Sequence, residues 1–287
     1  MTIAAVPLVF LAVNSSDVGT GQAATARCPD ANRSGRFIVK LNVKGVQRTA
    51  LANVSPAAAR RGPMPLIVAL HGAGGNGRFM ESYSGLTPVA NKAGFAVVYP
   101  DAEGKFWQLV PGSDPAHDDV TFIRALVQHL ERTSCVDPAR VFVTGVSNGG
   151  GLAARLGCEM SDVFLATAPV AGRYSVLPPC HPEQPVSILE VHGTNDAAVN
   201  YKEVPVLLAQ WRSLDRCSSR VIRRRLAPHT LFTKWPQCAG HATVQHVKLF
   251  GGEHGWPQTP LGGPASDSHY NAAAGVVGFF SSVRPRP

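Results

Sequence analysis

The sequence lacks the features by which membrane proteins and metal-binding proteins are most readily recognised. A membrane-spanning helix needs about 18 or more apolar residues in a row, whereas the N-terminal apolar run covers only residues 3–13. Neither a C-x-x-C pair nor an H-E-x-x-H motif occurs among the 6 cysteines and 10 histidines. We therefore expect no stable membrane insertion, no metal site and no cofactor.

Acidic residues are also scarce, at 19 against 27 basic ones, so the formal net charge is +8 and the pI is near 9.4. Arg220 and the run Arg223–Arg225 concentrate part of this charge, which can attract anionic polymers. No nucleic-acid-binding motif and no interleaved aromatic residues accompany this cluster. A solvated basic face is the favoured interpretation, and we expect no nucleic-acid partner.

The N-terminal segment resembles a secretory signal peptide in two respects. Residues 3–13 form a short apolar core, and the small residues Ala24-Thr25-Ala26 follow as a cleavage site, although the usual basic region before the core is missing. We expect residues 1–26 to be a signal peptide, residues 27–287 to form a single domain, and the protein to be secreted or periplasmic. A disordered apolar tail is the alternative.

The number of cysteines, 6, is even, which suits up to three disulfides in an oxidising compartment. The two pairs that lie close together in the sequence are expected to bond, and the two remaining cysteines then pair with each other. The expected bonds are Cys217 with Cys238, Cys158 with Cys180, and Cys28 with Cys135. Buried free thiols are the alternative.

Short apolar runs rich in β-branched residues alternate with segments of helical periodicity. The expected strands are 36–43 and 46–53, which form an antiparallel edge, then 65–70, 95–99, 140–144, 164–168, 186–191 and 242–250. The expected helices are 80–93, 118–133, 150–159, 202–213 and 268–283. This order predicts an α/β fold, with a mostly parallel sheet, helices on both faces, and ligands at the carboxyl ends of the strands.

The pentapeptide Gly145–Gly149 is a G-x-S-x-G motif centred on Ser147. It follows the predicted strand 140–144 and precedes the predicted helix 150–159, which is the context of a nucleophile elbow. A sharp turn there exposes the serine oxygen, and the flanking glycines let the neighbouring chain pass closely. The Asn148 N–H, at the start of the helix, is a candidate donor to an oxyanion. A simple glycine-rich turn is the alternative.

A second glycine-rich loop, His71–Gly77, follows the predicted strand 65–70. Loops of this kind supply the other half of an oxyanion hole. We expect the Ala73 N–H to be that donor, with Gly72 as the next candidate, and His71 to brace the loop beside the substrate.

The same loop also fits the pattern G-x-G-x-x-G, and Asp101 ends the next predicted strand, as in a dinucleotide-binding fold. Gly85 and Pro88 interrupt the helix that would carry the pyrophosphate. A secreted enzyme also rarely meets a nicotinamide cofactor. We therefore disfavour this alternative.

Two further candidate residues follow strand-like segments. Asp196 lies in a small polar turn after the predicted strand 186–191, and His254 lies in a glycine-flanked loop after 242–250. An isolated aspartate in a turn is usually structural. However, the chain order Ser147, Asp196, His254 is that of the catalytic serine, acid and histidine in α/β hydrolases, so we expect this triad within the single domain.

Together these stretches resemble the secreted polyhydroxybutyrate depolymerase-like and feruloyl esterase-like hydrolases related to carbohydrate esterase family 1, over most of residues 28–283. The resemblance is carried by His71-Gly-Ala-Gly-Gly-Asn76, Asp118-Asp-Val-Thr-Phe122, Cys135-Val-Asp-Pro-Ala-Arg-Val-Phe-Val-Thr-Gly-Val-Ser-Asn-Gly-Gly150, His192-Gly-Thr-Asn-Asp196 and His254-Gly-Trp-Pro257. It implies hydrolysis of carboxylic esters through an acyl-serine intermediate. The implied substrates are hydroxyalkanoate polymers or hydroxycinnamoyl and acetyl esters of polysaccharides.

The surroundings of the triad suggest an open cleft. The interval between Ala168 and Val186 is too short for a large helical lid, and Trp107 and Trp256 are candidate apolar walls for an acyl group, with core packing as an equal alternative for Trp107. No polymer-binding module is apparent, so soluble esters or oligomers are the expected substrates of a monomeric enzyme. A binding protein on a hydrolase scaffold, a peptidase and an acyltransferase remain alternatives.

Overall fold

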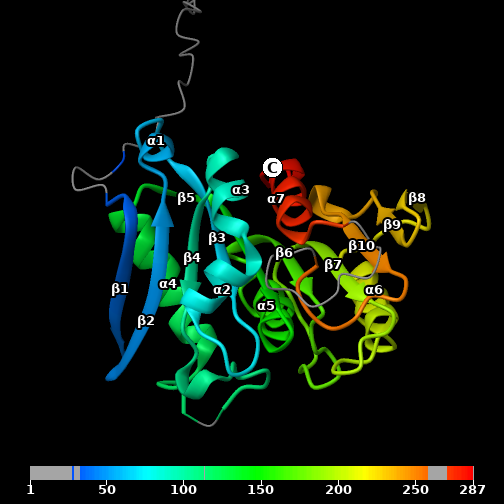
Figure 1. Ribbon diagram of the computed structural model, residues 1–287, viewed down its shortest axis with the longest axis horizontal. Coiled ribbons are helices and arrows are strands. Elements are labelled where there is room, and N and C mark those ends of the chain that lie inside the picture. The colour runs from blue at the N-terminus through cyan, green and yellow to red at the C-terminus, as the bar shows by residue number, and fades with distance from the viewer. Residues whose placement is uncertain (1–27, 29–32, 113, 258–269, 287) are drawn as a thin grey trace, which may run out of the picture.

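The computed structural model describes residues 28, 33–112, 114–257 and 270–286. The expected signal peptide, residues 1–26, lies outside the described residues. Within them, strands β1 to β10 form one ten-stranded sheet in the order β1-β2-β4-β3-β5-β6-β7-β10-β9-β8 (Figure 1).

The centre of the sheet is parallel and largely buried. Its strands are β4 (Ala96–Pro100), β3 (Met64–Leu70), β5 (Val136–Val146), β6 (Phe164–Val170), β7 (Ser187–Gly193) and β10 (Val244–Leu249). Every residue of β3, β4, β6 and β7 is buried, as expected of parallel strands that are covered on both faces. The central strands expected from the sequence are confirmed, including the one over 242–250.

The two edges of the sheet are antiparallel. One edge is the expected pair β1 (Gly35–Val43) and β2 (Val46–Val54), joined by a tight turn. The other is an unpredicted hairpin, β8 (Ile222–Ala227) and β9 (Thr230–Trp235). Arg223–Arg225 lie on β8 and are exposed, which confirms the solvated basic face. The strand escaped prediction because a run that faces solvent throughout lacks the apolar alternation of a half-buried strand.

Helices cover both faces of the sheet, as predicted. They are α1 (Pro56–Ala59), α2 (Gly77–Ser84), α3 (Leu86–Lys92), α4 (Asp119–Thr133), α5 (Asn148–Glu159), α6 (Glu203–Leu214) and α7 (Ala272–Ser282). Successive residues of β3 point to opposite faces: Ile67 packs in the cluster with α2, α3 and α7, and Val68 in the cluster with α4 and α5. Residues 171–186 contain no helix, so the expected absence of a large lid between β6 and β7 is confirmed.

One helix was predicted incorrectly. The expected helix over 80–93 is two helices, α2 and α3, because Gly85 adopts a left-handed conformation with φ of 60°. Such a residue ends the hydrogen-bonding pattern of α2 and turns the chain into α3. Among the described residues, no helix is long and apolar enough to cross a membrane.

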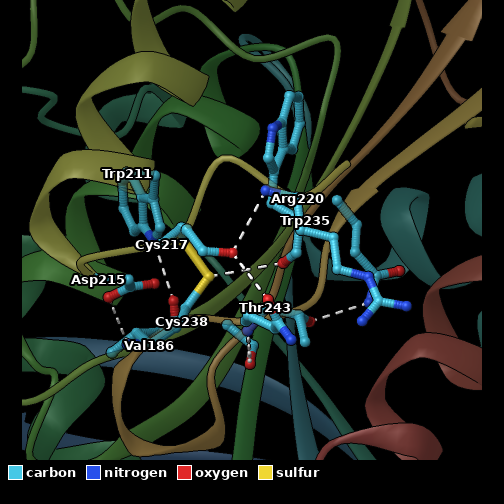
Figure 2. Close-up of a disulfide and its surroundings, with 12 residues drawn as sticks. Val186, Trp211, Asp215, Cys217, Arg220, Trp235, Cys238 and Thr243 are labelled. Carbon is cyan, nitrogen blue, oxygen red and sulfur yellow. Dashed lines mark hydrogen bonds between the residues drawn. A yellow bond between two sulfur atoms is a disulfide. The ribbon is translucent and has the colours of Figure 1, made fainter. Parts of the chain in front are cut away.

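All three expected disulfides are present: Cys28–Cys135, Cys158–Cys180 and Cys217–Cys238. Figure 2 shows that the third bond lies beside a buried junction at the end of α6. There the Trp211 indole N–H donates to the carbonyl of Val186 at 2.9 Å, and the Val186 N–H donates to the carboxylate of Asp215 at 3.2 Å. The disulfide therefore ties the segment after α6 to the one after β9.

Candidate active site

Ser147 lies at the sharp turn between β5 and α5, as the G-x-S-x-G motif predicts. Its backbone has φ of 58° and ψ of −120°, a strained conformation for a residue with a side chain. The turn depends on glycine at two positions. A Cβ atom on Gly145 would lie 2.4 Å from the carbonyl oxygen of Gly149, and one on Gly149 would lie 2.4 Å from that of His71. The motif therefore reflects close backbone packing around the serine.

His254 and Asp196 meet because their strands are neighbours. Each follows one of the parallel strands β7 and β10, whose carboxyl ends lie side by side. The His254 Nδ1 lies 2.7 Å from the Asp196 Oδ2. The side chain of Asp196 is fully buried, whereas that of His254 is 27% exposed. An imidazole held by a buried carboxylate on one nitrogen leaves its other nitrogen available for proton transfer.

The carboxylate of Asp196 is held firmly. Its Oδ1 accepts hydrogen bonds from the N–H groups of Ala198, at 2.9 Å, and Val199, at 2.7 Å. Burial alone would raise the pKa of Asp196, but hydrogen bonds from His192 and His254 outweigh burial and hold the pKa well below its usual range. Asp196 is therefore an anion at any pH at which a histidine base works.

Ser147 and His254 line the same cavity, which has a volume of about 600 Å³. Its other walls come from the glycine-rich loop, including Gly72 and Ala73, and from two aromatic residues of α2. These are Phe79 and Tyr83, whose rings stack with their centres 5.1 Å apart. Sequence reasoning missed this aromatic pair. The available signal was the spacing i, i+4 in a helix that directly follows the loop.

The loop that carries Ala73 is braced as expected. His71 is fully buried, its Nδ1 lies 2.7 Å from the carbonyl of Gly72, and its Nε2 accepts a hydrogen bond from the Ala102 N–H at 3.1 Å. Burial lowers the pKa of His71, so the ring is neutral and donates through Nδ1. The brace thus fixes the peptides from which the Gly72 and Ala73 N–H groups project, while the imidazole itself stays outside the cavity.

Asn148 has two structural roles in this site. As the first residue of α5, it carries an N–H that the helix itself does not pair. Its side chain forms two hydrogen bonds with the main chain of Trp107, accepting from the N–H at 2.7 Å and donating to the carbonyl at 3.1 Å. The start of α5 and the segment around Trp107 are thereby held together.

Neither expected tryptophan wall lies in the cavity. Trp107 is 3% exposed and Trp256 is 2% exposed, and both belong to the buried core. The Trp107 indole N–H donates to the carbonyl of His71 at 2.9 Å, so this residue supports the loop from behind. The prediction of a cleft wall is therefore wrong for Trp256, and for Trp107 the equal alternative, core packing, is the one observed. Spacing along the chain could not show it, because adjacent side chains in a loop point in different directions.

Residues 49–211, more than half of the chain, match the family described as esterase PHB depolymerase. The chain belongs to this family. Among curated proteins, this family member is similar to the putative esterase NocK of Nocardia uniformis subsp. tsuyamanensis, at 36% identity over 173 residues, which cover 58% of this chain and 49% of that protein. It is also similar to feruloyl esterase B of Piromyces equi, at 28% identity over 213 residues, with coverages of 66% and 39%. The chain thus spans less than half the length of both relatives.

The α/β-hydrolase fold predicted from the sequence is confirmed by solved structures. The acetyl xylan esterase from Aspergillus awamori superposes with a TM-score of 0.62 at 16% identity, covering 76% of this chain and 94% of that one. A ferulic acid esterase superposes with a TM-score of 0.60 at 15% identity, covering 89% and 100%. At such low identity the likeness concerns the fold alone.

Proposed function

We propose that this protein is an extracellular serine esterase that hydrolyses carboxylic esters through an acyl-serine intermediate. The observation that carries the proposal is the Asp196–His254 pair, at 2.7 Å, whose imidazole lines the same cavity as Ser147. Membership of the esterase PHB depolymerase family and the esterase names of its relatives agree with it. The three disulfides support an extracellular or periplasmic location.

In the first half of the proposed reaction, the Nε2 of His254 takes the proton of Ser147 as the serine oxygen attacks the ester carbonyl carbon. The carbonyl oxygen becomes an oxyanion, which accepts hydrogen bonds from the N–H groups of Ala73 and Asn148, with Gly72 as the next candidate. The proton on His254 then passes to the leaving alcohol. In the second half, water repeats the attack and releases the acid.

The cavity wall suggests which acyl group the enzyme accepts. Phe79 and Tyr83 present stacked aromatic rings next to Ser147, and Phe79 is 46% exposed. A planar aromatic acyl group buries more surface against such a wall than an acetyl group does. We therefore place hydroxycinnamoyl esters ahead of acetyl esters as substrates of a monomeric enzyme, with hydroxybutyrate oligomers as the next class.

Initial-rate hydrolysis by the wild-type protein and Ser147→Ala tests the function. The panel contains methyl ferulate, p-nitrophenyl acetate and butyrate, 3-hydroxybutyrate oligomers and an amino-acid anilide. Ester hydrolysis by the wild type alone supports the proposal, and the best substrate names the acyl class. Failure of both proteins on every ester would favour a binding protein, whereas cleavage of the anilide alone would favour a peptidase.

A further inference from the structure

A buried cluster of ionisable side chains lies beneath Asp196. Glu190 and His192 are two residues apart on β7 and therefore share one face of the sheet. His246 on β10 is the direct neighbour of Glu190 across the parallel pairing of these strands. All three residues are buried. We call Glu190, His192 and His246 the β7–β10 cluster. Charged groups in such a position are costly unless they are paired, so their contacts indicate what the cluster does.

Both ring nitrogens of His192 face oxygen atoms. The Nδ1 lies 3.0 Å from the Oε1 of Glu190. The Nε2 lies 3.1 Å from the Oδ2 of Asp196 and 3.2 Å from the carbonyl oxygen of Val199. Ionised carboxylates and carbonyls only accept hydrogen bonds, and a neutral imidazole has a single N–H to offer. Only the doubly protonated ring donates on both sides.

Glu190 supplies the counter-charge for this cation. Its Oε1 also accepts a hydrogen bond from the Tyr174 hydroxyl at 3.0 Å, and its Oε2 lies 2.7 Å from the Nδ1 of His246. The Nε2 of His246 lies 3.0 Å from the Tyr201 hydroxyl, which can donate to it. The Nδ1 of His246 also lies 3.2 Å from the main-chain carbonyl oxygen of Glu190, so its N–H is directed at oxygen atoms of that residue. A neutral His246 with its one proton on Nδ1 is compatible with both neighbours, and we assign the negative charge of Glu190 to its pairing with His192.

These contacts complete the surroundings of the carboxylate of Asp196. Its Oδ1 accepts two main-chain N–H groups, and its Oδ2 faces His254 at 2.7 Å and His192 at 3.1 Å. With Glu190 and Asp196 negative and His192 positive, the buried groups carry one net negative charge. That charge is the one needed to stabilise the imidazolium that His254 becomes when it accepts the serine proton.

We propose that His192 is a protonated positioning residue for the Ser147–Asp196–His254 triad, and that Glu190 keeps it protonated. The inference rests on the proposed function, because it assigns a role within that same triad. In this arrangement His192 holds the Asp196 carboxylate in the orientation that serves His254. Glu190 acts through His192, because among the described residues it contacts neither His254 nor the lining of the cavity.

Several ionisable groups face His192 or its partners from the surrounding elements. They are Glu190, Asp196, Tyr174, Tyr201, His246, Lys248 and His254. Burial opposes a charge on His192, but hydrogen bonds to Asp196 and Glu190 outweigh it and raise the pKa of His192 to about 10. Burial likewise opposes the charge on Glu190, and hydrogen bonds from His192 and His246 nevertheless lower its pKa. The raised pKa of His192 and the lowered pKa of Glu190 both agree with the contacts described above.

The variant Glu190→Gln tests the proposal through the pH dependence of kcat/KM on a soluble ester. It keeps the shape of the side chain and removes its charge, so burial should release the proton of His192 within the assay range. We expect wild-type kcat/KM to stay level from pH 7 to pH 9, and that of Glu190→Gln to fall about tenfold. The double variant Glu190→Gln/His192→Gln should lack this fall, because the titrating group is gone.

Matched controls are available on α4, away from the cavity lining. His129→Gln and Glu131→Gln make the same chemical changes on partly exposed residues and should keep the wild-type profile. Circular dichroism at each pH ensures that only folded protein is compared. An unchanged profile in Glu190→Gln, or a loss that is equal at every pH, would show a purely structural role and overturn the proposal.

A second measurement requires neither a variant that folds nor an active enzyme. In wild-type protein with ¹⁵N-labelled histidine, both ring nitrogens of His192 should carry protons from pH 6 to pH 9. A neutral ring in that range would overturn the proposal. If the wild type hydrolyses no ester, the proposed function fails, and this spectrum still decides the charge state of His192.

Discussion

Two histidines contact the same oxygen atom of Asp196, and their surroundings differ in every other respect. His254 lies on a glycine-flanked loop, lines the cavity and has one carboxylate partner, with its side chain 27% exposed. His192 lies on β7, is buried, and has carboxylates on both sides. A ring that must exchange a proton with substrate needs one free nitrogen, whereas a ring with both nitrogens occupied can only hold its neighbours in place. The comparison supports the proposal of His254, and not His192, as the base, although both histidines contact Asp196.

The largest expected difference between the two histidines is the loss of kcat when each is replaced. His254→Gln should lower kcat by about 10⁴-fold, as loss of a triad member does in related chemistry. His192→Gln should lower it by roughly 10- to 100-fold, the usual range for an outer partner that orients a functional group. Steady-state kinetics on methyl ferulate measures both, with Ser147→Ala as the reference for complete loss. Equal losses in the two histidine variants would erase the distinction between base and positioning residue.

Stability should show the opposite ranking. His192→Gln removes the cation between two buried carboxylates, and leaving a buried charge without its partner costs about 3–5 kcal/mol. His254→Gln removes one hydrogen bond to the Asp196 carboxylate from a partly exposed loop residue and should lower the free energy of unfolding by a smaller amount, about 1–2 kcal/mol. Urea unfolding at pH 7 measures the difference. A His192→Gln protein as stable as the wild type would contradict the buried ion pair.

Asp215 extends the comparison to a buried carboxylate with a different environment. Unlike Glu190, which lies between two histidines, Asp215 accepts one N–H from Val186 beside the Cys217–Cys238 disulfide (Figure 2). Burial raises the pKa of Asp215 to about 7 from the ordinary value of 3.8. Between these values the folded state keeps a proton that the unfolded state has lost, so stability falls as pH rises from 4 to 7.

The variant Asp215→Asn keeps the shape of this side chain and cannot ionise. We expect it to be more stable than the wild type by about 2–4 kcal/mol at pH 8, at about 1.4 kcal/mol per pKa unit, with little difference near pH 4. Thermal unfolding at both pH values measures this. A gain of the same size at pH 4 would mean that the charge of Asp215 is not its cause.

The smallest expected effect concerns the cavity wall. Phe79→Ala should raise KM for methyl ferulate about tenfold, because roughly 1–2 kcal/mol of apolar contact with the ring is lost. It should leave KM for p-nitrophenyl acetate nearly unchanged. Phe106→Ala removes an exposed ring outside the cavity lining and serves as the matched control. Equal KM changes on both esters would argue against an aromatic acyl site at Phe79.

Prediction from the sequence succeeded where the determinants are local. The central strands, the turn at Ser147 and two disulfides were foreseen from apolar runs, glycine spacing and proximity along the chain, and the third disulfide, Cys28–Cys135, followed by elimination. Prediction failed where tertiary packing decides whether an aromatic side chain lies in the core or lines the cavity. Trp256 lies two positions after His254 and Trp107 precedes a loop rich in Gly, Pro and Asp, yet both side chains lie in the core, and Phe79 and Tyr83 form the wall instead.

The sequence by itself determined the order of the central strands, the strained turn at Ser147 and the presence of an acid and a histidine after later strands, because these depend on periodicity, glycine and chain order. Only the tertiary structure decided which ionisable side chains lie close enough to influence one another's charge. Glu190 and His246 are 56 positions apart and become neighbours through the pairing of β7 with β10. Electrostatic coupling depends on distance in space and on burial, and neither can be read from the spacing of residues along the chain.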